Sequence, residues 1–221
     1  MTISKLIRLL GQEYGLPQWQ SQRDPLSELI RAILSQNTSD VNSHRAFDKL
    51  ISTFGTWDRV AEANIDAIAE AIACGGLSRI KAPRIKSILK RILNDHGSLD
   101  LGFLGQLPLP EARAWLQSLP GVGPKTANCV LLFSLGMPAL PVDTHVYRIC
   151  RRLGLIGPKV SPARAHQILE EFIPAEAIYQ FHINVLAHGR RVCRAQRPRC
   201  RECILLEGCV YGKGAIRATG S

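Results

Sequence analysis

The spacing of the apolar residues limits the fold of this chain more than any other feature of its sequence. Between Leu26 and Leu34 they occupy positions i, i+3, i+4, i+7 and i+8, which lie on one face of an α-helix. No segment sustains the two-residue alternation of a β-strand. The sequence therefore predicts an all-α fold of roughly ten short helices joined by short loops. Further apolar stripes with helical spacing lie within residues 47–54, 65–72, 85–93 and 146–153.

Residues that start and stop helices flank these stripes. Asp24–Pro25 has the form of an N-cap followed by the first helical residue, and Gly55 and Gly97 follow stripes as C-terminal stops. We expect the helix that ends at Gly97 to begin near Pro83, because proline suits the first turn. The pattern thus sets most helix boundaries.

Neither a membrane span nor a secretion signal is predicted. The longest apolar stretch, Ala127–Val142, is broken by polar residues, glycine and two prolines. The N-terminal residues lack an uninterrupted apolar region and a small-residue cleavage site. We therefore expect an intracellular protein, which would be cytoplasmic and nucleoid-associated in a bacterium or archaeon.

Positive charge is concentrated near the C-terminal end. The chain has a formal net charge of +10, and six arginines with no acidic residue lie between Gly189 and Arg201. Such a run can be a solvated surface, but this density favours a polyanionic partner, most commonly a phosphate backbone. We expect Arg194, Arg197 and Arg199 to contact DNA phosphates, or else to offset the negative charge of a neighbouring metal centre.

Four of the seven cysteines lie within seventeen positions, as Cys193, Cys200, Cys203 and Cys209. An odd cysteine count without a secretion signal argues against a disulfide framework. Structural zinc usually takes two closely spaced pairs, whereas this array has one CxxC and two single cysteines. Four thiolates also suit a [4Fe–4S] cluster. The spacing alone leaves both metal centres open.

The segment Leu119–Ala127 joins two predicted helices through a glycine-rich turn. Gly121 and Gly123 allow unusual backbone conformations and a close approach by another backbone. Pro124 suits the first position of the second helix, whose N-terminal N–H groups would then face a phosphate. The alternative is an ordinary helix–helix turn, but the basic character of the chain favours DNA-backbone binding.

Lys125 and Asp143 are the candidate catalytic residues. Lys125 falls in the first turn of the second hairpin helix, where the helix dipole opposes its charge and favours the neutral, nucleophilic amine. Asp143 precedes the 146–153 stripe as an N-cap, and its second oxygen could serve as a catalytic carboxylate. The alternatives are a lysine that only touches phosphate and an aspartate that only caps. His145 is a further candidate DNA contact.

These motifs together resemble the endonuclease III family of helix-hairpin-helix DNA glycosylases. The matching pieces run in the family's order over about residues 25–210: Leu34–Asp40, Gly76–Leu77, Leu119–Asn128, Val142–His145, His188–Arg190 and the cysteine array. The resemblance implies a [4Fe–4S] cluster held by the four cysteines. It also implies two lobes: a six-helix barrel domain over 25–137 and a discontinuous cluster domain formed by 1–24 and 138–211, with a flexible tail over 212–221.

The resemblance further implies a bifunctional DNA glycosylase and AP lyase of base excision repair. In that family the amine equivalent to Lys125 attacks the deoxyribose C1′ and forms a Schiff base that undergoes β-elimination, while Asp143 would stabilise positive charge on the sugar. The expected substrates are oxidised pyrimidines such as thymine glycol, and abasic sites, in double-stranded DNA. The protein is expected to be a monomer.

The alternatives are a monofunctional T/G or U/G mismatch glycosylase on the same fold, a non-catalytic DNA-binding module and a zinc protein. The pair of Lys125 and Asp143 favours the bifunctional enzyme, since the first two alternatives do not need both residues.

The resemblance also carries over residues that would contact DNA. Leu77 matches an intercalating leucine, and Thr126 belongs to the hairpin. The family often carries a glutamine that fills the gap left by the flipped base. Asn37 stands in that column and Gln36 one residue earlier, so the resemblance leaves both as candidates for this DNA contact. Gln117 and Pro124 replace an acidic residue and an arginine that are common in the family.

Overall fold

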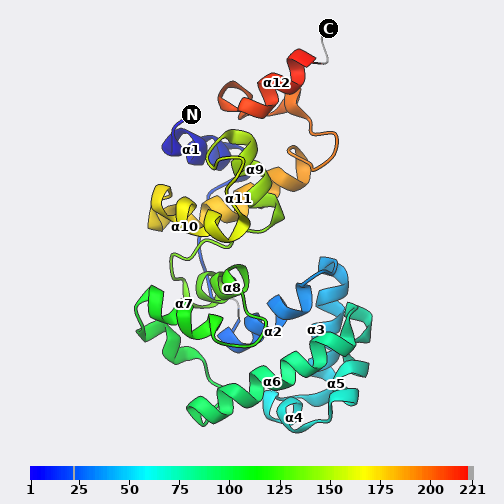
Figure 1. Cartoon of the computed structure of the whole chain (residues 1–221). Coiled ribbons are helices and arrows are strands. Elements are labelled where there is room, and N and C mark those ends of the chain that lie inside the picture. Colours follow the sequence, from blue (N-terminus) through cyan, green and yellow to red (C-terminus); the bar gives the residue numbers. More distant parts are fainter. Residues whose placement is uncertain (22, 219–221) are drawn as a thin grey trace. The chain divides into compact units, whose positions relative to one another are not determined.

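The computed structural model describes residues 1–21 and 23–218, and within them the chain is entirely helix and loop (Figure 1). No described residue lies in a β-strand, so the all-α prediction is confirmed. The chain divides into two compact units, one of Ser21–Met137 and one that joins Met1–Gln20 to the chain from Pro138 onward. The assignment of a barrel domain and a cluster domain stays a prediction.

The continuous unit, Ser21–Met137, is organised around one buried helix. Helix α8 is buried along nearly its whole length and packs against α2 and α7. This burial follows from its sequence, which is apolar on almost every side. The helices of this unit are α2 (Pro25–Ser35), α3 (Asp40–Phe54), α4 (Trp57–Glu62), α5 (Ile65–Ala71), η1 (Ala73–Gly75), α6 (Ser78–His96), η2 (Gly102–Gln106), α7 (Leu109–Gln117) and α8 (Pro124–Leu135).

Most helix boundaries in this unit lie where the flanking residues predict them. The Asp24 carboxylate accepts a hydrogen bond from the Ser27 N–H at 2.9 Å, and Pro25 is the first residue of α2. Gly55 and Gly97 end α3 and α6 with φ of 78° and 70°. Glycine suits these positions because other residues rarely adopt positive φ.

The predicted start of α6 near Pro83 is wrong. The helix begins five residues earlier, at Ser78, and Pro83 lies inside it. The apolar stripe extends toward the N-terminus through the buried stem of Lys81, and the Leu77 carbonyl already accepts from the Lys81 N–H at 2.9 Å. The cost of one missing backbone bond at Pro83 is therefore outweighed by packing.

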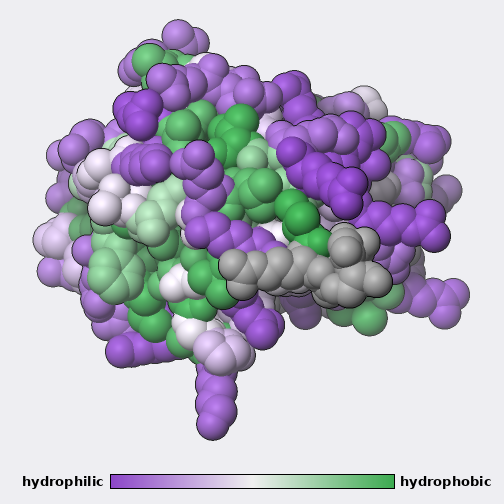
Figure 2. All heavy atoms as spheres, turned by 90° about the horizontal axis from the view of Figure 1, so that it is seen from above, coloured by the Kyte–Doolittle hydropathy of each residue, from purple (hydrophilic) through white to green (hydrophobic). Residues whose placement is uncertain are grey.

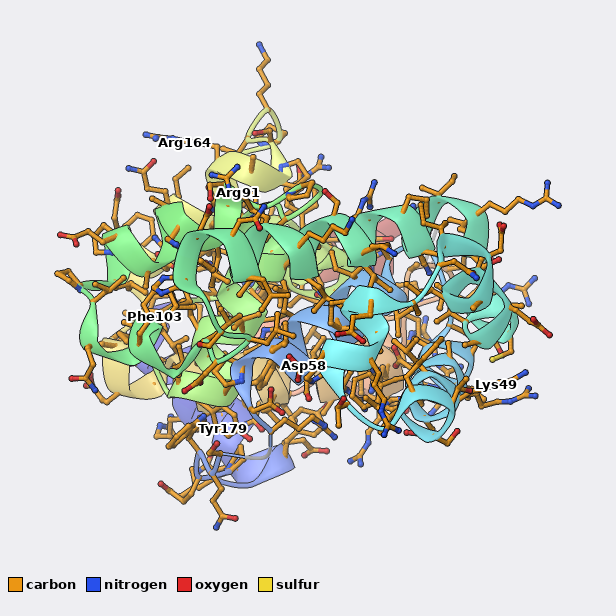
Figure 3. All side chains as sticks on the ribbon, turned by 90° about the horizontal axis from the view of Figure 1, so that it is seen from below. Lys49, Asp58, Arg91, Phe103, Arg164 and Tyr179 are labelled. Atoms are coloured by element: carbon orange, nitrogen blue, oxygen red, sulfur yellow. The ribbon has the colours of Figure 1, made fainter. Side chains whose placement is uncertain are left out.

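An aromatic cluster fixes the connection from α6 to α7. The Phe103 ring, labelled in Figure 3, lies 3.7 Å from the His96 ring and 5.2 Å from the Trp115 ring, measured between centroids. Aromatic pairs at such distances add to the stability of the packing. The cluster thus attaches the loop between α6 and α7 to both helices.

The discontinuous unit combines the N-terminal helix with the C-terminal third of the chain. Helix α11 packs against both α1 and α9, burying Phe181 and Val185. The Asn184 amide donates to the Gly15 carbonyl at the end of α1, at 3.0 Å. Its helices are α1 (Ile3–Tyr14), α9 (Thr144–Leu153), α10 (Pro162–Phe172), η3 (Ala175–Ala177), α11 (Ile178–Arg191), η4 (Cys200–Glu202), η5 (Leu206–Gly208) and α12 (Val210–Ala218).

The flexible tail predicted for residues 212–221 is a helix over its described part. Helix α12 spans Val210–Ala218, and residues 219–221 lie outside the described residues. The Arg152 guanidinium lies 4.4 Å from the centroid of the Tyr211 ring, and Gly212 is buried and donates its N–H to the Cys209 sulfur at 3.3 Å. These contacts supply the burial that a glycine-rich segment lacks by itself.

Hydropathy along the helices gives no membrane span. Within residues 1–21 and 23–218, no helix is long and apolar enough to cross a bilayer. The face in Figure 2 shows hydrophilic side chains around apolar patches.

Candidate functional site

Helices α7 and α8 form the predicted helix–hairpin–helix. The Val122 N–H donates to the Leu119 carbonyl at 3.2 Å, and Gly121 takes the positive φ of 74° that the turn requires. Gly123 is the N-cap of α8, without a side-chain hydrogen bond, and no atom within 4 Å would touch a Cβ placed there. Pro124 is the first residue of the helix, as predicted. The helix N-terminus and its open glycine can therefore accept an anion.

Lys125, the second residue of α8, is half-buried. The positive charge of Lys125 acts on the carboxyl of Glu28 in α2. Burial raises the pKa of Glu28, and the charges of Arg23, Arg31 and Lys125 oppose that rise. Glu28 also pairs with Arg23 at 3.6 Å. The carboxylate is therefore stabilised by a group of cations that includes the candidate nucleophile. The sequence analysis missed Glu28 because its position in the first turn of a helix has a sufficient explanation in the helix dipole.

Gln36 and Asn37 are neighbours in sequence but differ in surroundings. The Gln36 side chain is half-buried and forms hydrogen bonds to the hairpin, at the Gly121 carbonyl and the Thr126 hydroxyl, both at 3.3 Å. Asn37 is exposed and holds a left-handed backbone conformation with φ of 52°. Asparagine tolerates this conformation better than most residues. The structure thus joins Gln36, Gly121 and Thr126 and leaves Asn37 on the surface.

Leu77, like Asn37, is an exposed residue with a left-handed backbone conformation. It has φ of 54° and is 47% exposed, immediately before α6. A left-handed leucine is uncommon, and an exposed one leaves apolar surface in water, so its neighbours must hold it in place. Gly76, with φ of 68°, precedes it, and the Thr38 hydroxyl donates to the Gly75 carbonyl. This bond connects the Asn37 loop to the Leu77 loop.

A buried lysine forms hydrogen bonds to the backbone just before the Asn37 loop and just before the Leu77 loop. Lys81 is 2% exposed, and its Nζ donates to the Leu34 carbonyl at 2.6 Å and the Gly75 carbonyl at 3.4 Å. Burial, followed by the charge of Arg84, lowers the Lys81 pKa. The sequence analysis missed this residue. It could have been found because Lys81 lies on the same helical stripe as Ile85 and Ile88, at a position that must face the core.

In the other unit, Asp143 caps α9 as predicted. Its Oδ1 accepts from the N–H groups of His145 and Val146, at 2.9 and 2.8 Å. Both bonds use the same oxygen, so the cap employs only one side of the carboxylate. Burial raises the pKa of the Cys150 thiol far above its ordinary value, and the negative charge of Asp143 adds to the rise.

Arg148 connects the start of α9 to the first cysteine of the array. Its Nη2 lies 3.2 Å from the His145 Nδ1 and donates to the Cys193 carbonyl at 3.0 Å and the Gly189 carbonyl at 3.3 Å. His145 is half-buried as a result. Gly189 is required here because a Cβ would lie 2.7 Å from the His145 ring nitrogen. Sequence reasoning treated Arg148 as part of the general positive charge.

The four cysteines of the array line one pocket. Cys193, Cys200, Cys203 and Cys209 border about 360 Å³ of space free of protein atoms, part of it open to solvent. Within residues 1–21 and 23–218, no group of three or more Cys, His, Asp or Glu side chains converges closely enough to hold a single metal ion. A four-iron cube offers a separate iron to each thiolate, so its ligands need not converge on one point.

Hydrogen-bond donors reach two of these sulfur atoms. The Arg152 Nη1 donates to the Cys193 sulfur at 3.4 Å, and the Gly212 N–H donates to Cys209. The Cys203 sulfur lies 3.6 Å from the Nε2 of His188, whose pKa burial lowers to about 4. Burial raises the pKa of Cys203 itself to about 11. Burial raises the pKa of Cys200 as well, so these two thiols favour the neutral form until a cationic metal centre binds, and the four cysteines are of the kind that hold an iron–sulfur cluster.

The arginines predicted to contact phosphate are exposed. Arg194, Arg197 and Arg199 lie in the loop between Cys193 and Cys200, and Arg197 adopts φ of 47°. Arg199 pairs with Glu202 at 3.6 Å, so one of the three has an acidic neighbour. Arg152 anchors the backbone of the loop by donating to the Arg194 and Ala195 carbonyls at 2.6 and 2.9 Å. The loop therefore has a fixed base and outward-facing cations.

Comparison with known proteins gives a consistent result. A family model described as HhH-GPD superfamily base excision DNA repair protein matches residues 30–175. A putative DNA glycosylase of Arabidopsis thaliana is 41% identical over 165 residues, which make up 75% of this chain and 56% of that protein. Endonuclease III of Thermotoga maritima is 34% identical over 219 residues, covering 97% of both chains. A solved structure of a trapped endonuclease III–DNA covalent intermediate matches with a TM-score of 0.82 and 30% identity, covering 97% of both chains.

Proposed function

The chain belongs to the HhH-GPD superfamily of base excision DNA repair proteins, and we propose that it excises damaged bases and cleaves the resulting abasic site with Lys125 as nucleophile. It is a DNA glycosylase and AP lyase of base excision repair. The observation that carries the residue assignment is the position of Lys125, second in a helix that follows an open glycine hairpin and has no side-chain cap. A phosphate bound at this N-terminus would bring the adjoining sugar to the lysine amine.

Lys125 acts on the deoxyribose of a nucleotide whose base has been flipped out of the duplex. Its neutral amine adds to C1′, the bond from C1′ to the base nitrogen breaks, and the base leaves with that electron pair and takes up a proton. The attached nitrogen gives up a proton, and its lone pair then expels O4′, which opens the sugar ring and takes up a proton. The protonated imine left between Lys125 and C1′ makes the C2′ proton acidic. Loss of that proton expels the 3′ phosphate by β-elimination and nicks the strand, and water then releases the lysine.

Asp143 supplies negative charge to the same reaction. The sugar becomes positively charged as the base leaves, and a fixed carboxylate stabilises that charge. The cap of α9 uses Oδ1, so the carboxylate is oriented before DNA arrives.

Several residues hold the distorted DNA around the extruded nucleotide. Exposed Asn37 fills the gap left by the flipped base, and Leu77 inserts its apolar side chain between neighbouring bases. Gly121 and Gly123 let the phosphate backbone approach the hairpin closely. His145, which belongs to the discontinuous unit, also contacts the DNA backbone. Arg194, Arg197 and Arg199 bind phosphates farther along the duplex.

The cysteine array holds a [4Fe–4S] cluster that fixes the arginine loop. Cys193, Cys200, Cys203 and Cys209 are its ligands, and the Arg152 and Gly212 donors stabilise the thiolate charge. The bound cluster would supply a rigid crosslink within residues 193–209. None of the glycosylase or lyase steps requires an electron from it.

The preferred substrates are oxidised pyrimidines and abasic sites in double-stranded DNA, and the protein acts as a monomer in the compartment that holds the genome. The alternative is a monofunctional mismatch glycosylase, which releases a base without cleaving the strand. Lys125 favours the bifunctional enzyme, since water-activating glycosylases need no amine at the sugar.

Strand cleavage of a duplex with one preformed abasic site tests this assignment. Lys125→Ala should abolish cleavage and largely spare binding, because the hairpin N–H groups and the arginine loop are unchanged. The matched control is Lys49→Ala, which removes an exposed lysine from α3 and should cleave at the wild-type rate. Retained cleavage by Lys125→Ala would remove this lysine from the reaction.

A further inference from the structure

A continuous set of hydrogen bonds runs from α6 through Gln36 to the hairpin. The Arg84 Nη1 donates to the Gln36 Oε1 at 2.8 Å. The Gln36 Nε2 donates to the Gly121 carbonyl and the Thr126 hydroxyl, each at 3.3 Å. A guanidinium can only donate, so the amide oxygen must face Arg84 and the amide nitrogen must face the hairpin. The orientation of the Gln36 amide is thereby fixed.

The two hairpin partners of Gln36 lie on either side of Lys125 in sequence. Gly121 belongs to the turn, whereas Thr126 directly follows Lys125 and is 4% exposed. Arg84 lies against the same turn, since a Cβ on Gly121 would come within 2.6 Å of the Arg84 Cδ and 2.7 Å of its Cζ. Together, Gln36 and Arg84 contact the turn before the lysine and the helix after it.

We propose that Gln36, oriented by Arg84, is a positioning residue that fixes the hairpin so that Lys125 is aligned with the sugar. This inference rests on the proposed function of Lys125. Both the oxygen and the nitrogen of the Gln36 amide form hydrogen bonds within the protein, so this side chain stabilises the hairpin. Asn37 is therefore the residue of the pair that contacts DNA. Small misplacements of a nucleophile reduce the rate of the chemical step more than they reduce binding.

The test uses two substitutions: one removes both halves of the Gln36 amide, and the other changes only the half that faces the hairpin. Gln36→Met keeps the side-chain length and removes all three hydrogen bonds. Gln36→Glu keeps an acceptor for Arg84 and places an oxygen against the Gly121 carbonyl. The matched control is Gln106→Met, which makes the same chemical change at an exposed position in η2 of the same unit.

The readouts are the single-turnover rate of borohydride trapping on an abasic duplex at saturating enzyme, and the Kd for a duplex with a tetrahydrofuran abasic analogue. Gln36→Met and Gln36→Glu should each slow trapping about ten-fold and change the Kd by less than about two-fold. Gln106→Met should match wild type in both measurements. Wild-type trapping rates in both Gln36 variants, or an effect confined to the Kd, would overturn the positioning role.

A double-mutant cycle tests the part played by Arg84, and Gln36→Glu alone still tests the positioning role if Gln36→Met folds poorly. Arg84→Met should slow trapping less than Gln36→Met does, and the double variant should be no slower than Gln36→Met alone, because Arg84 acts through Gln36. If the double variant slowed trapping by the product of the two single effects, Arg84 would act independently of Gln36 and the coupling would be overturned. A wild-type enzyme that forms no adduct would overturn the proposed function and this inference together, whereas an active wild type with unaffected Gln36 variants would overturn this inference alone.

Discussion

At the scale of single residues, Asp143 combines a structural and a catalytic task. One carboxylate oxygen caps α9. The negative charge of the carboxylate would stabilise the positive charge that develops on the sugar. The two tasks can be separated because asparagine caps helices about as well as aspartate but carries no charge. The sequence predicted the cap correctly, since Asp143 directly precedes an apolar helical stripe, and its catalytic role stays a prediction.

Asp143→Asn should slow base removal at least ten-fold while the midpoint of chemical unfolding stays close to that of wild type. Asp143→Ala should slow base removal similarly and also lose about 1 kcal/mol of stability, because the cap disappears. The measurements are single-turnover base release and urea unfolding. Unchanged base release in Asp143→Asn would leave the residue as a cap only.

Lys81 shows what pattern reasoning misses at this scale. A lysine is normally read as a surface residue, but this one satisfies carbonyls at the ends of two loops from a buried position. Hydrogen bonds between segments distant in sequence leave no trace in periodicity, so neither the carbonyl partners of Lys81 nor the link from Gln36 to the hairpin could be predicted. The residues that carry these bonds were visible, but their partners were not.

Lys81→Met should destabilise the protein by roughly 1–3 kcal/mol, because the buried Leu34 carbonyl loses its donor. The control is Lys90→Met on the exposed side of the same helix, which should change stability by less than about 0.5 kcal/mol. Urea unfolding of both variants gives the comparison. Equal stabilities would show that the Lys81 bonds contribute nothing net.

At the scale of elements, the sequence predicts helices well and their termini less well. Caps at Asp24, Asp143 and Gly97 lie as expected, since each is a local interaction. The start of α6 was wrong because tertiary burial of Lys81 extends the helix past Pro83. Helix α12 was missed because part of its packing comes from a distant element: the Arg152 guanidinium lies over the Tyr211 ring, and no local window contains both residues.

The arginine loop between Cys193 and Cys200 is the element whose proposed role depends most on charge. Replacing Arg194, Arg197 and Arg199 with alanine should weaken DNA binding and reduce the slope of log K against log salt by up to about 3, one for each lost phosphate contact. Replacing Arg8, Arg45 and Arg59, which are exposed on other elements, makes the same change in net charge and should leave the slope nearly unchanged. Equal slopes in both triple variants would remove the loop from the DNA interface.

At the scale of the whole molecule, the cysteine array and the helical hairpin were readable from the sequence because each is contiguous. The spacing of the cysteines left zinc and iron–sulfur open. The pocket lined by all four sulfurs, with donors directed at Cys193 and Cys209, supports the cluster.

The purified protein should be brown, with a broad visible absorbance band near roughly 400 nm and about four irons per chain. Cys203→Ser should lose most of that absorbance and reduce the stability of the unit that contains it, since the cluster crosslinks residues 193–209. A colourless protein with one zinc ion per chain would contradict the cluster.

Lys125 should form a covalent intermediate with the sugar of damaged DNA. Borohydride trapping on a duplex with a single thymine glycol tests it most directly, comparing wild type, Lys125→Ala and the control Lys49→Ala. We expect a stable protein–DNA adduct in wild type and Lys49→Ala, and none in Lys125→Ala. Release of free base by wild type without any adduct would contradict it and would establish a monofunctional glycosylase.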